Sequence, residues 1–323
     1  MNYFKFSHAN RSQQTGIALV VVLWVLALLS IIALAYSGMT RNENVLTRNI
    51  LHTAQARAEA EAGFWLAAYD LLKPANTRLL TPDGSPMNIP VEPRRRLTVA
   101  IQDESGKIDI NKASQQLLIG LFSAAGVEYD QSTQLVDALL DWRDKDNLQR
   151  INGAEDSDYS AAGLPYGAKD GTFNSIEELI QLRGITPEIF KKLKPAITIH
   201  SMQARIRLHS APISVLNSLP GMTEELITEI MASRLERGNV IIPALIPDSV
   251  RPLVFTSGQG NVYTITSDAQ VEGMNSRLQV TLILKKSGNR PITILDWQEN
   301  APPLRQKQIV DPMIDNNDDA SEL

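Results

Sequence analysis

The 323-residue chain contains no cysteine, which excludes disulfides, thiolate metal ligands and a cysteine nucleophile. Histidine is scarce as well, because only His8, His52, His200 and His209 occur, and no two of them have the spacing of a metal-binding pair. The sequence also lacks a G-x-S-x-G turn, a P-loop and an H-E-x-x-H run. We therefore expect a protein that is not an enzyme.

Positive charge is not in excess either. The 31 Lys and Arg against 36 Asp and Glu give a formal net charge of −5, which weighs against nucleic acid as the main partner. Apolar residues make up 43% and charged residues 21%, as in ordinary globular proteins. The length is enough for one large or two modest domains with a proper core.

What the chain does have is a long apolar run near its start. Residues 17–36 contain no charge and no polar stripe, and a helix of that length crosses a hydrocarbon core of about 30 Å. Lys5 and Arg11 precede the run without any acid between them. The bias of positive charge toward the cytoplasm predicts a single-pass protein with residues 1–16 in the cytoplasm and the rest outside.

A secretory signal peptide is the alternative, since Ala33 and Ala35 could form an A-x-A cleavage site. However, the apolar run is longer than the usual core of a signal peptide, of about 7–15 residues. Residues 37–72 then continue without proline, with apolar residues at helical spacings, and Pro74 is the first stop. We predict one helix from about Ile17 to Leu72, roughly 80 Å long, apolar over 17–36 and amphipathic over 37–72.

This helix resembles the N-terminal helix of type IV pilins and pseudopilins. In that family a short basic leader ends in glycine and a prepilin peptidase cuts after it, which implies a leader of residues 1–16 and a cut between Gly16 and Ile17. Glycine suits the site because the peptidase must approach the backbone closely, although Gly16 alone could equally be a helix N-cap. The sequence departs from the family at the fifth mature position, where Val21 replaces the usual glutamate.

The remaining chain predicts an α+β fold: a pilin-like long N-terminal helix packed on a small antiparallel sheet, with a large inserted helical domain. We assign residues 73–103 to a linker and a first strand at 97–103, and residues 104–250 to the helical domain. Residues 251–300 hold the last strands, with a hairpin around the turn at 272–275. The acidic tail, 301–323, is expected to be disordered.

The helical domain contains an internal repeat. Residues 107–121 align with 205–219, and residues 178–193 echo 215–230, each with a glycine turn between helices. These units resemble helix-hairpin-helix (SAM-like) repeats, which also occur in membrane-anchored DNA-uptake receptors. Here Glu188, Glu224 and Glu225 follow the turns and would repel a phosphate. We therefore read the hairpins as packing units and expect no nucleic acid.

The densest group of ionisable residues lies in the loop at 139–159. It carries six carboxylates within 18 residues: Asp141, Asp144, Asp146, Glu155, Asp156 and Asp158. Ca²⁺ takes about 6–8 oxygen ligands in irregular geometry, so the loop is a candidate calcium site, although it does not match an EF-hand. The alternative is a solvated acidic loop, diluted by Arg143, Lys145 and Arg150.

The loop is also similar to a run, DWxDxD…GAE…Y, of the general secretion pathway protein K family. That resemblance implies calcium held by Asp144, Asp146, Glu155 and Asp158, with Asp141 and Asp156 as further candidates. It also implies a minor pseudopilin of the type II secretion system, in the bacterial inner membrane with periplasmic soluble domains, at the tip of the pseudopilus. Its expected partners are the prepilin peptidase and the minor pseudopilins I and J. Contact with secreted cargo or the secretin stays open, as do a DNA-uptake receptor and a minor type IV pilin.

Overall fold

The computed structural model describes residues 15–234, 246–285 and 289–301. The chain divides into two compact units, Met1–Gln55 and Ala56–Leu323. Most of the predicted leader and the acidic tail from residue 302 lie outside the described residues. The disorder predicted for that tail is therefore not tested.

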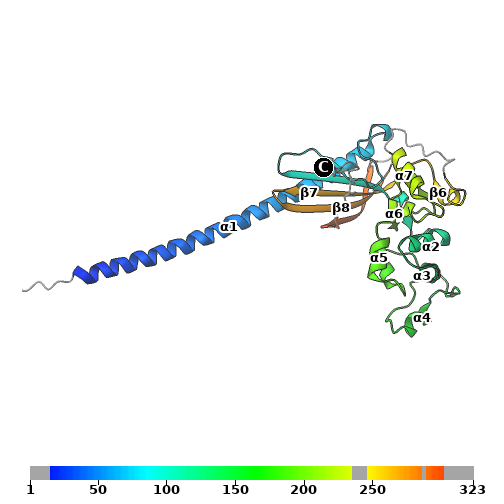
Figure 1. Ribbon diagram of the computed structural model, residues 1–323, viewed down its shortest axis with the longest axis horizontal. Coiled ribbons are helices and arrows are strands. Elements are labelled where there is room, and N and C mark those ends of the chain that lie inside the picture. Colours follow the sequence, from blue (N-terminus) through cyan, green and yellow to red (C-terminus); the bar gives the residue numbers. More distant parts are fainter. Residues whose placement is uncertain (1–14, 235–245, 286–288, 302–323) are drawn as a thin grey trace, which may run out of the picture. The chain divides into compact units, whose positions relative to one another are not determined.

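The predicted long helix is confirmed as α1, Thr15–Leu72 (Figure 1). Its first part is the one helix of the described residues that is long and apolar enough to cross a membrane. Large apolar side chains from Ile17 to Tyr36 are all half or more exposed, as expected for a surface that faces lipid. The helix ends just before Pro74, which cannot continue it.

The antiparallel sheet is confirmed as well and has five strands in the order β1-β2-β7-β8-β9. These are β1 (Met87–Ile89), β2 (Arg95–Asp103), β7 (Val262–Val271), β8 (Met274–Leu284) and β9 (Ile292–Glu299). The β7–β8 turn is tighter than the four residues expected, because Met274 and Asn275 already belong to β8. Glu272 and Gly273 alone make it, with φ of 47° and 87°, the left-handed pair that a two-residue hairpin needs.

The second part of α1 packs on one face of this sheet. Ala60, Phe64, Ala67, Ala68 and Leu71 recur at spacings of three and four, so they form one helical stripe. Alternate residues of the strands meet this stripe and complete a core of their own: Leu97, Val99, Ile101, Tyr263, Ile265, Ala269, Leu278, Val280 and Leu282. The opposite face of the sheet is polar and points away from α1.

The chain leaves the sheet after β2 and returns at β7. Asp103 and Tyr263 are register partners, so both ends of the inserted region start from neighbouring strands. Its helices are α2 (Gln115–Ala124), α3 (Tyr129–Arg143), α4 (Asp156–Ala161), α5 (Pro187–Leu193), α6 (Ile213–Leu216) and α7 (Glu224–Ser233), grouped beyond that end of the strands (Figure 1). They share a second core, separate from the sheet core.

Two pairs of short parallel strands tie the inserted region together. β3 (Ile108–Asp109) pairs with β4 (Ile197–Thr198), and β5 (Ile206–Arg207) pairs with β6 (Val254–Phe255). Because β6 pairs with β5, the inserted region extends to Phe255. The sequence predicts an end of this region at residue 250 and a start of the last strands at 251. Strands of two residues carry too little pattern to be seen in a sequence.

The two aligned segments of the inserted region make matching contacts. At the end of α3, Arg143 donates to the carbonyl oxygens of Ile110 (2.5 Å) and Ala113 (2.8 Å). Just after α7, Arg234 donates to the carbonyl oxygens of Leu208 and Ala211. Ile110 and Leu208 occupy aligned positions, as do Ala113 and Ala211. A guanidinium therefore satisfies the same two buried carbonyl groups in each segment.

The contact between α1 and the sheet depends on Gly63. A Cβ at this position would lie within 3 Å of Ser267 Oγ and 2.8 Å from Leu97 Cδ1. Replacing Gly63 with alanine should therefore separate helix and sheet and destabilise Ala56–Leu323 by roughly 1–3 kcal/mol, a fall of several degrees in Tm. Thermal unfolding by circular dichroism measures this. Gly38→Ala is the matched control, because no atom lies within 4 Å of its Cβ, and an equal loss in both variants would contradict the packing explanation.

Candidate metal centre

The acidic loop folds back onto the end of α3. Asp144 is the C-cap of this helix, and its extended backbone turns the chain away from the axis. Gly153 then lies so close to Asp141 that a Cβ there would overlap the aspartate carboxylate. The loop thus needs glycine at 153 to bring its second half, and Glu155 with it, beside the buried end of the helix.

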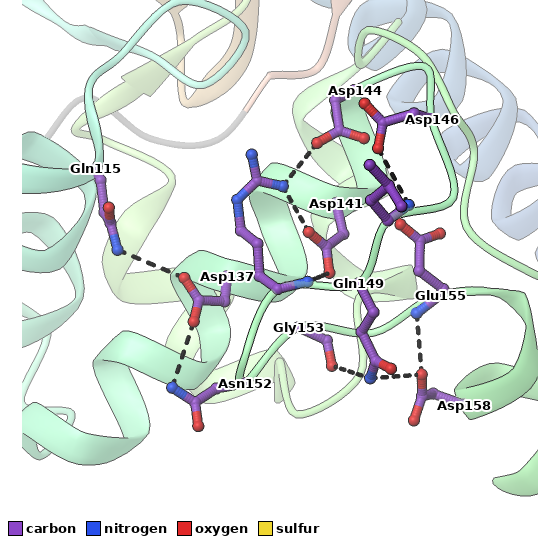
Figure 2. A network of polar contacts seen from close by, with 12 residues as sticks. Gln115, Asp137, Asp141, Asp144, Asp146, Gln149, Asn152, Gly153, Glu155 and Asp158 are labelled. Atoms are coloured by element: carbon purple, nitrogen blue, oxygen red, sulfur yellow. Dashed lines mark hydrogen bonds and ion pairs between the residues drawn. The ribbon is translucent and has the colours of Figure 1, made fainter.

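One cation, Arg150, bridges the first two carboxylates. Its Nη1 donates to Asp141 Oδ1 and Asp144 Oδ2, each at 2.6 Å, and its backbone N–H donates to Asp141 Oδ2 at 3.2 Å (Figure 2). Burial lowers the pKa of Arg150, but the bonds to Asp144 and Asp141 outweigh burial and raise it. Asp141 is fully buried, so it depends on this guanidinium for its charge balance.

Glu155 has no such partner. Its side chain is only 5% exposed, and neither carboxylate oxygen has a hydrogen-bond partner among the described residues. Asp144 Oδ1 and Asp170 Oδ1 are buried without a partner in the same way. Burial raises the pKa of Glu155 to about 7, and the nearby charges of Asp141, Asp170, Asp144 and Asp156 add to the shift.

Two predicted ligands are engaged elsewhere. Asp146 Oδ1 accepts a hydrogen bond from the backbone of Leu148 at 3.0 Å. Asp158 Oδ2 accepts bonds from the backbone N–H of Glu155 (3.1 Å), the residue before α4, and from Gln149 Nε2 (2.9 Å) (Figure 2). Asp158 also pairs with Arg183 at 3.7 Å.

The structure therefore brings together Asp141, Asp144 and Glu155, places Asp156 within electrostatic range of Glu155, and leaves Asp146 and Asp158 in local backbone contacts. The assignment of the six as metal ligands stays a prediction.

Sequence reasoning missed Asp170, which lies outside the loop. Its backbone has φ of 54°, and the following Gly171 donates its N–H to the carbonyl of Trp142, the residue beside Asp141 on α3. The Asp-Gly dipeptide signals a turn, but nothing in the sequence shows that this turn returns to the acidic loop. Asp170 adds a further carboxylate to the group around Glu155.

Aromatic rings close the other side of the loop. Trp142 is buried and its ring centroid lies 5.6 Å from Tyr159 and 6.3 Å from both Tyr166 and Phe173. Trp142 is thus a packing residue. This apolar wall explains why burial dominates the raised pKa values, including that of Tyr159, which reaches about 12.

The donor set suits a hard cation. The acceptor groups that gather here are carboxylates, and several of their oxygens are buried without a partner among the described residues, which is the chemistry of calcium rather than zinc. The fit is chemical and not yet geometric. Among residues 15–234, 246–285 and 289–301, no three acids or histidines converge closely enough to hold a metal ion.

Comparison with known proteins gives the context of this site. Residues 96–202 match the family described as "Type II secretion system (T2SS), protein K". Proteins named type II secretion system protein K are similar to the chain, among them those of Pectobacterium carotovorum subsp. carotovorum (29% identical over 220 residues, 61% of this chain and 67% of the relative) and Pseudomonas aeruginosa (27% over 245 residues, 67% and 72%). A putative one from Escherichia coli K12 is 26% identical, over 58% of this chain and 63% of the relative.

The fold is also found in a solved structure. A chain of the crystal structure of the GspK-GspI-GspJ complex from the enterotoxigenic Escherichia coli type 2 secretion system matches with a TM-score of 0.53 and 18% identity, over 81% of this chain and 99% of that one. The fold shared with that structure includes a long N-terminal helix on an antiparallel sheet. By sequence, the chain is similar to the type II secretion system protein K family over the residues matched.

Glu155 predicts an unusual pH dependence of the metal-free protein. A carboxyl whose folded pKa is about 7, above its ordinary value of 4.5, binds more protons when folded. It favours the folded state at low pH, and that contribution disappears as the pH rises from about 4.5 to 7. In chelator, Glu155→Gln should match the native chain near pH 4.5 and be more stable at pH 7.5, by on the order of 2 kcal/mol. Urea unfolding at several pH values measures the difference, and two parallel profiles would contradict the raised pKa.

Proposed function

We propose that the chain is a minor pseudopilin that caps the tip of the periplasmic pseudopilus and supports its assembly. Three features support the proposal: the N-terminal segment, the place of the inserted region along α1, and the exposed apolar side chains of α1. We also propose that this role is structural and involves no catalysis.

The N-terminal segment suits processing and anchoring. The bond between Gly16 and Ile17 lies in the first turn of α1, and we propose that prepilin peptidase cuts it, with the N-terminus cytoplasmic and the soluble part periplasmic. Val21 would then be the fifth mature residue. Without a carboxylate there, the chain lacks the charge that pairs with the N-terminal amine of a neighbour in the pilins it resembles. Such a subunit suits a position with nothing above it.

The place of the inserted region is the observation that carries the tip assignment. Near its start in Ala56–Leu323, α1 meets the beginning of β2, where Glu59 pairs with Arg95 at 2.6 Å. At the other end, Arg78 donates to the carbonyl of Leu71 (2.7 Å) and to Gln259 (3.1 Å), which lies just before β7. The inserted region thus joins the sheet at the C-terminal end of α1, and its bulk would block a further subunit there.

Partners would contact the uncovered side of α1. Trp65, Leu66, Tyr69 and Leu72 are about half exposed or more, opposite the stripe that packs on the sheet. Scattered exposed apolar residues are common, but four within eight positions on one helix indicate a contact surface. We propose that the minor pseudopilins I and J pack here, since the similar fold was solved in complex with GspI and GspJ.

The hairpins of the inserted region are proposed as helix-hairpin-helix packing units. Gly184 and Gly221 both have positive φ, and the hydroxyls of Thr186 and Thr223 cap α5 and α7. The DNA-uptake alternative needs the amides after these turns to bind phosphate. In both helices the threonine hydroxyl already accepts from the amide three residues on, and an acid stands in the first turn.

We also propose that the acidic loop binds calcium. Asp144, Glu155 and Asp170 offer the buried, unpartnered carboxylate oxygens, and Asp141 is the next candidate if Arg150 moves away. Bound calcium would neutralise the repulsion between acids that adds to the effect of burial on the pKa of Glu155. Asp146, Asp156 and Asp158 remain candidates from the resemblance.

Removing the inserted region tests the tip assignment. Residues 105–260 are replaced by a short turn between the register partners Asp103 and Tyr263, and the separate sheet core should keep the pilin-like part folded. Immunogold labelling should place the native chain at one end of each pseudopilus and the shortened chain along its length. Pull-down with I and J should succeed for both. If the shortened chain still labels only the ends, the inserted region is not what stops growth.

Chelation tests the calcium site. Excess EGTA should lower the Tm of the native chain by several degrees, since a ligand at 100 times its Kd contributes about 2.7 kcal/mol. Asp144→Asn and Glu155→Gln should abolish this response. The Glu155→Gln variant should be more stable than the native chain in EGTA and less stable than the native chain in calcium. Asp248→Asn is the control, because that side chain is 91% exposed and remote in sequence. An unchanged Tm on chelation would contradict calcium binding and favour the alternative interpretation, a solvated acidic loop.

A further inference from the structure

The polar face of the sheet carries a hollow of about 190 Å³ that the proposed function does not use. Six side chains form two rows across β2, β7 and β8. Arg96, Gln270 and Asn275 are register partners in the first row, and Thr98, Asp268 and Arg277 are partners in the second. Partners in such rows lie about 5 Å apart, so each row presents its groups together. The hollow lies at the hairpin end of the sheet, opposite the end where the inserted region joins.

The second row is already satisfied. Arg277 donates to Asp268, with Nε at 3.1 Å, so the single acid of the hollow is neutralised. Thr98 donates its hydroxyl to Asn88 at 2.8 Å. Nothing in this row calls for a ligand.

The first row is different. Within the described part of the chain, Arg96, Gln270 and Asn275 have no side-chain hydrogen bond and Arg96 has no acidic partner, although its neighbours Arg94 and Arg95 pair with Glu272 and Glu59. A guanidinium and two amide groups side by side are donors that match a carboxylate. The hollow contains no aromatic ring on which a sugar or a base could stack. Its chemistry therefore selects an acidic peptide side chain.

The described chain leads directly to this site. Ala301 is buried, and its carbonyl accepts a hydrogen bond from Arg277 Nη1 at 3.2 Å. Residues 311–323 then carry five acids and no base. Ten residues reach up to roughly 33 Å, more than enough to return to the first row.

We propose that the acidic segment 311–323 of this chain binds through its carboxylates to Arg96, Gln270 and Asn275. A tethered segment has an effective concentration of about 1 mM, so even a contact with a Kd near 1 mM is about half occupied. A separate acidic partner at about 10 µM would fill the same contact on the order of 1% of the time. This difference favours the chain's own segment over a partner protein.

Spectroscopic labels test the proposal, and the absence of native cysteine makes them specific. Met87→Cys, in the exposed β1 beside the hollow, and Ser321→Cys receive a spin-label pair in the detergent-solubilised full chain. The distance distribution should contain a short population in 50 mM salt that falls at 500 mM, because the Debye length shortens.

Matched variants decide the result. Arg96→Gln should reduce the short population roughly three- to fivefold, as expected for one charged contact, while Arg94→Gln, which removes the same charge outside the hollow, should not. Converting the five acids to amides should reproduce the loss with Arg96 intact. Equal distributions in Arg96→Gln and Arg94→Gln overturn the proposal, and so does a native chain without the short population. Unchanged Tm in all variants shows that folding is not the cause.

Discussion

The close contact between α1 and the sheet is the constraint on which the rest of the molecule depends. Small residues make it possible, since Ala60, Gly63, Ala67 and Ala68 let the helix lie directly on alternate apolar residues of the strands. This contact aligns β2 with the helix and so places Asp103 at the helix's C-terminal end. The inserted region begins there for that reason. The proposed tip position thus rests on helix–sheet packing as well as on the bulk of the inserted region.

The acidic loop shows the opposite kind of constraint, in which packing creates an unfavourable environment. An aromatic wall around Trp142 packs beside the loop, and Arg150 bridges the charges of Asp141 and Asp144. Glu155 is left buried beside other acids, and its pKa is raised first by burial and further by repulsion from those acids. A hard cation would relieve this repulsion, whereas a proton relieves it only in part. The same chemical problem therefore accounts for both the pH dependence and the proposed calcium affinity.

The sequence predicts features that depend on local pattern. The apolar run and proline-free continuation specify α1, and alternation with a Glu-Gly turn specifies the β7–β8 hairpin. Features that depend on partners distant in the chain cannot be predicted from the sequence. β1 and the two-residue strands exist only because another strand lies beside them. In the candidate site, Arg150 appears from the sequence to dilute the charge, but in the fold it bridges two acids, and Asp170 joins from beyond the loop. Such pairings are set by the tertiary fold.

The paired exit and return of the inserted region also determine how the molecule bears force. Asp103 and Tyr263 lie opposite each other on adjacent antiparallel strands, so the two ends of the inserted region connect to the sheet at neighbouring positions. Tension along α1 would pass into the sheet through the core that the helix and the strands share, and the hydrogen-bond ladder between β2 and β7 would resist it in shear. The inserted region lies outside this load path. A filament could then be pushed or pulled through its helices without straining the region that holds the acidic loop.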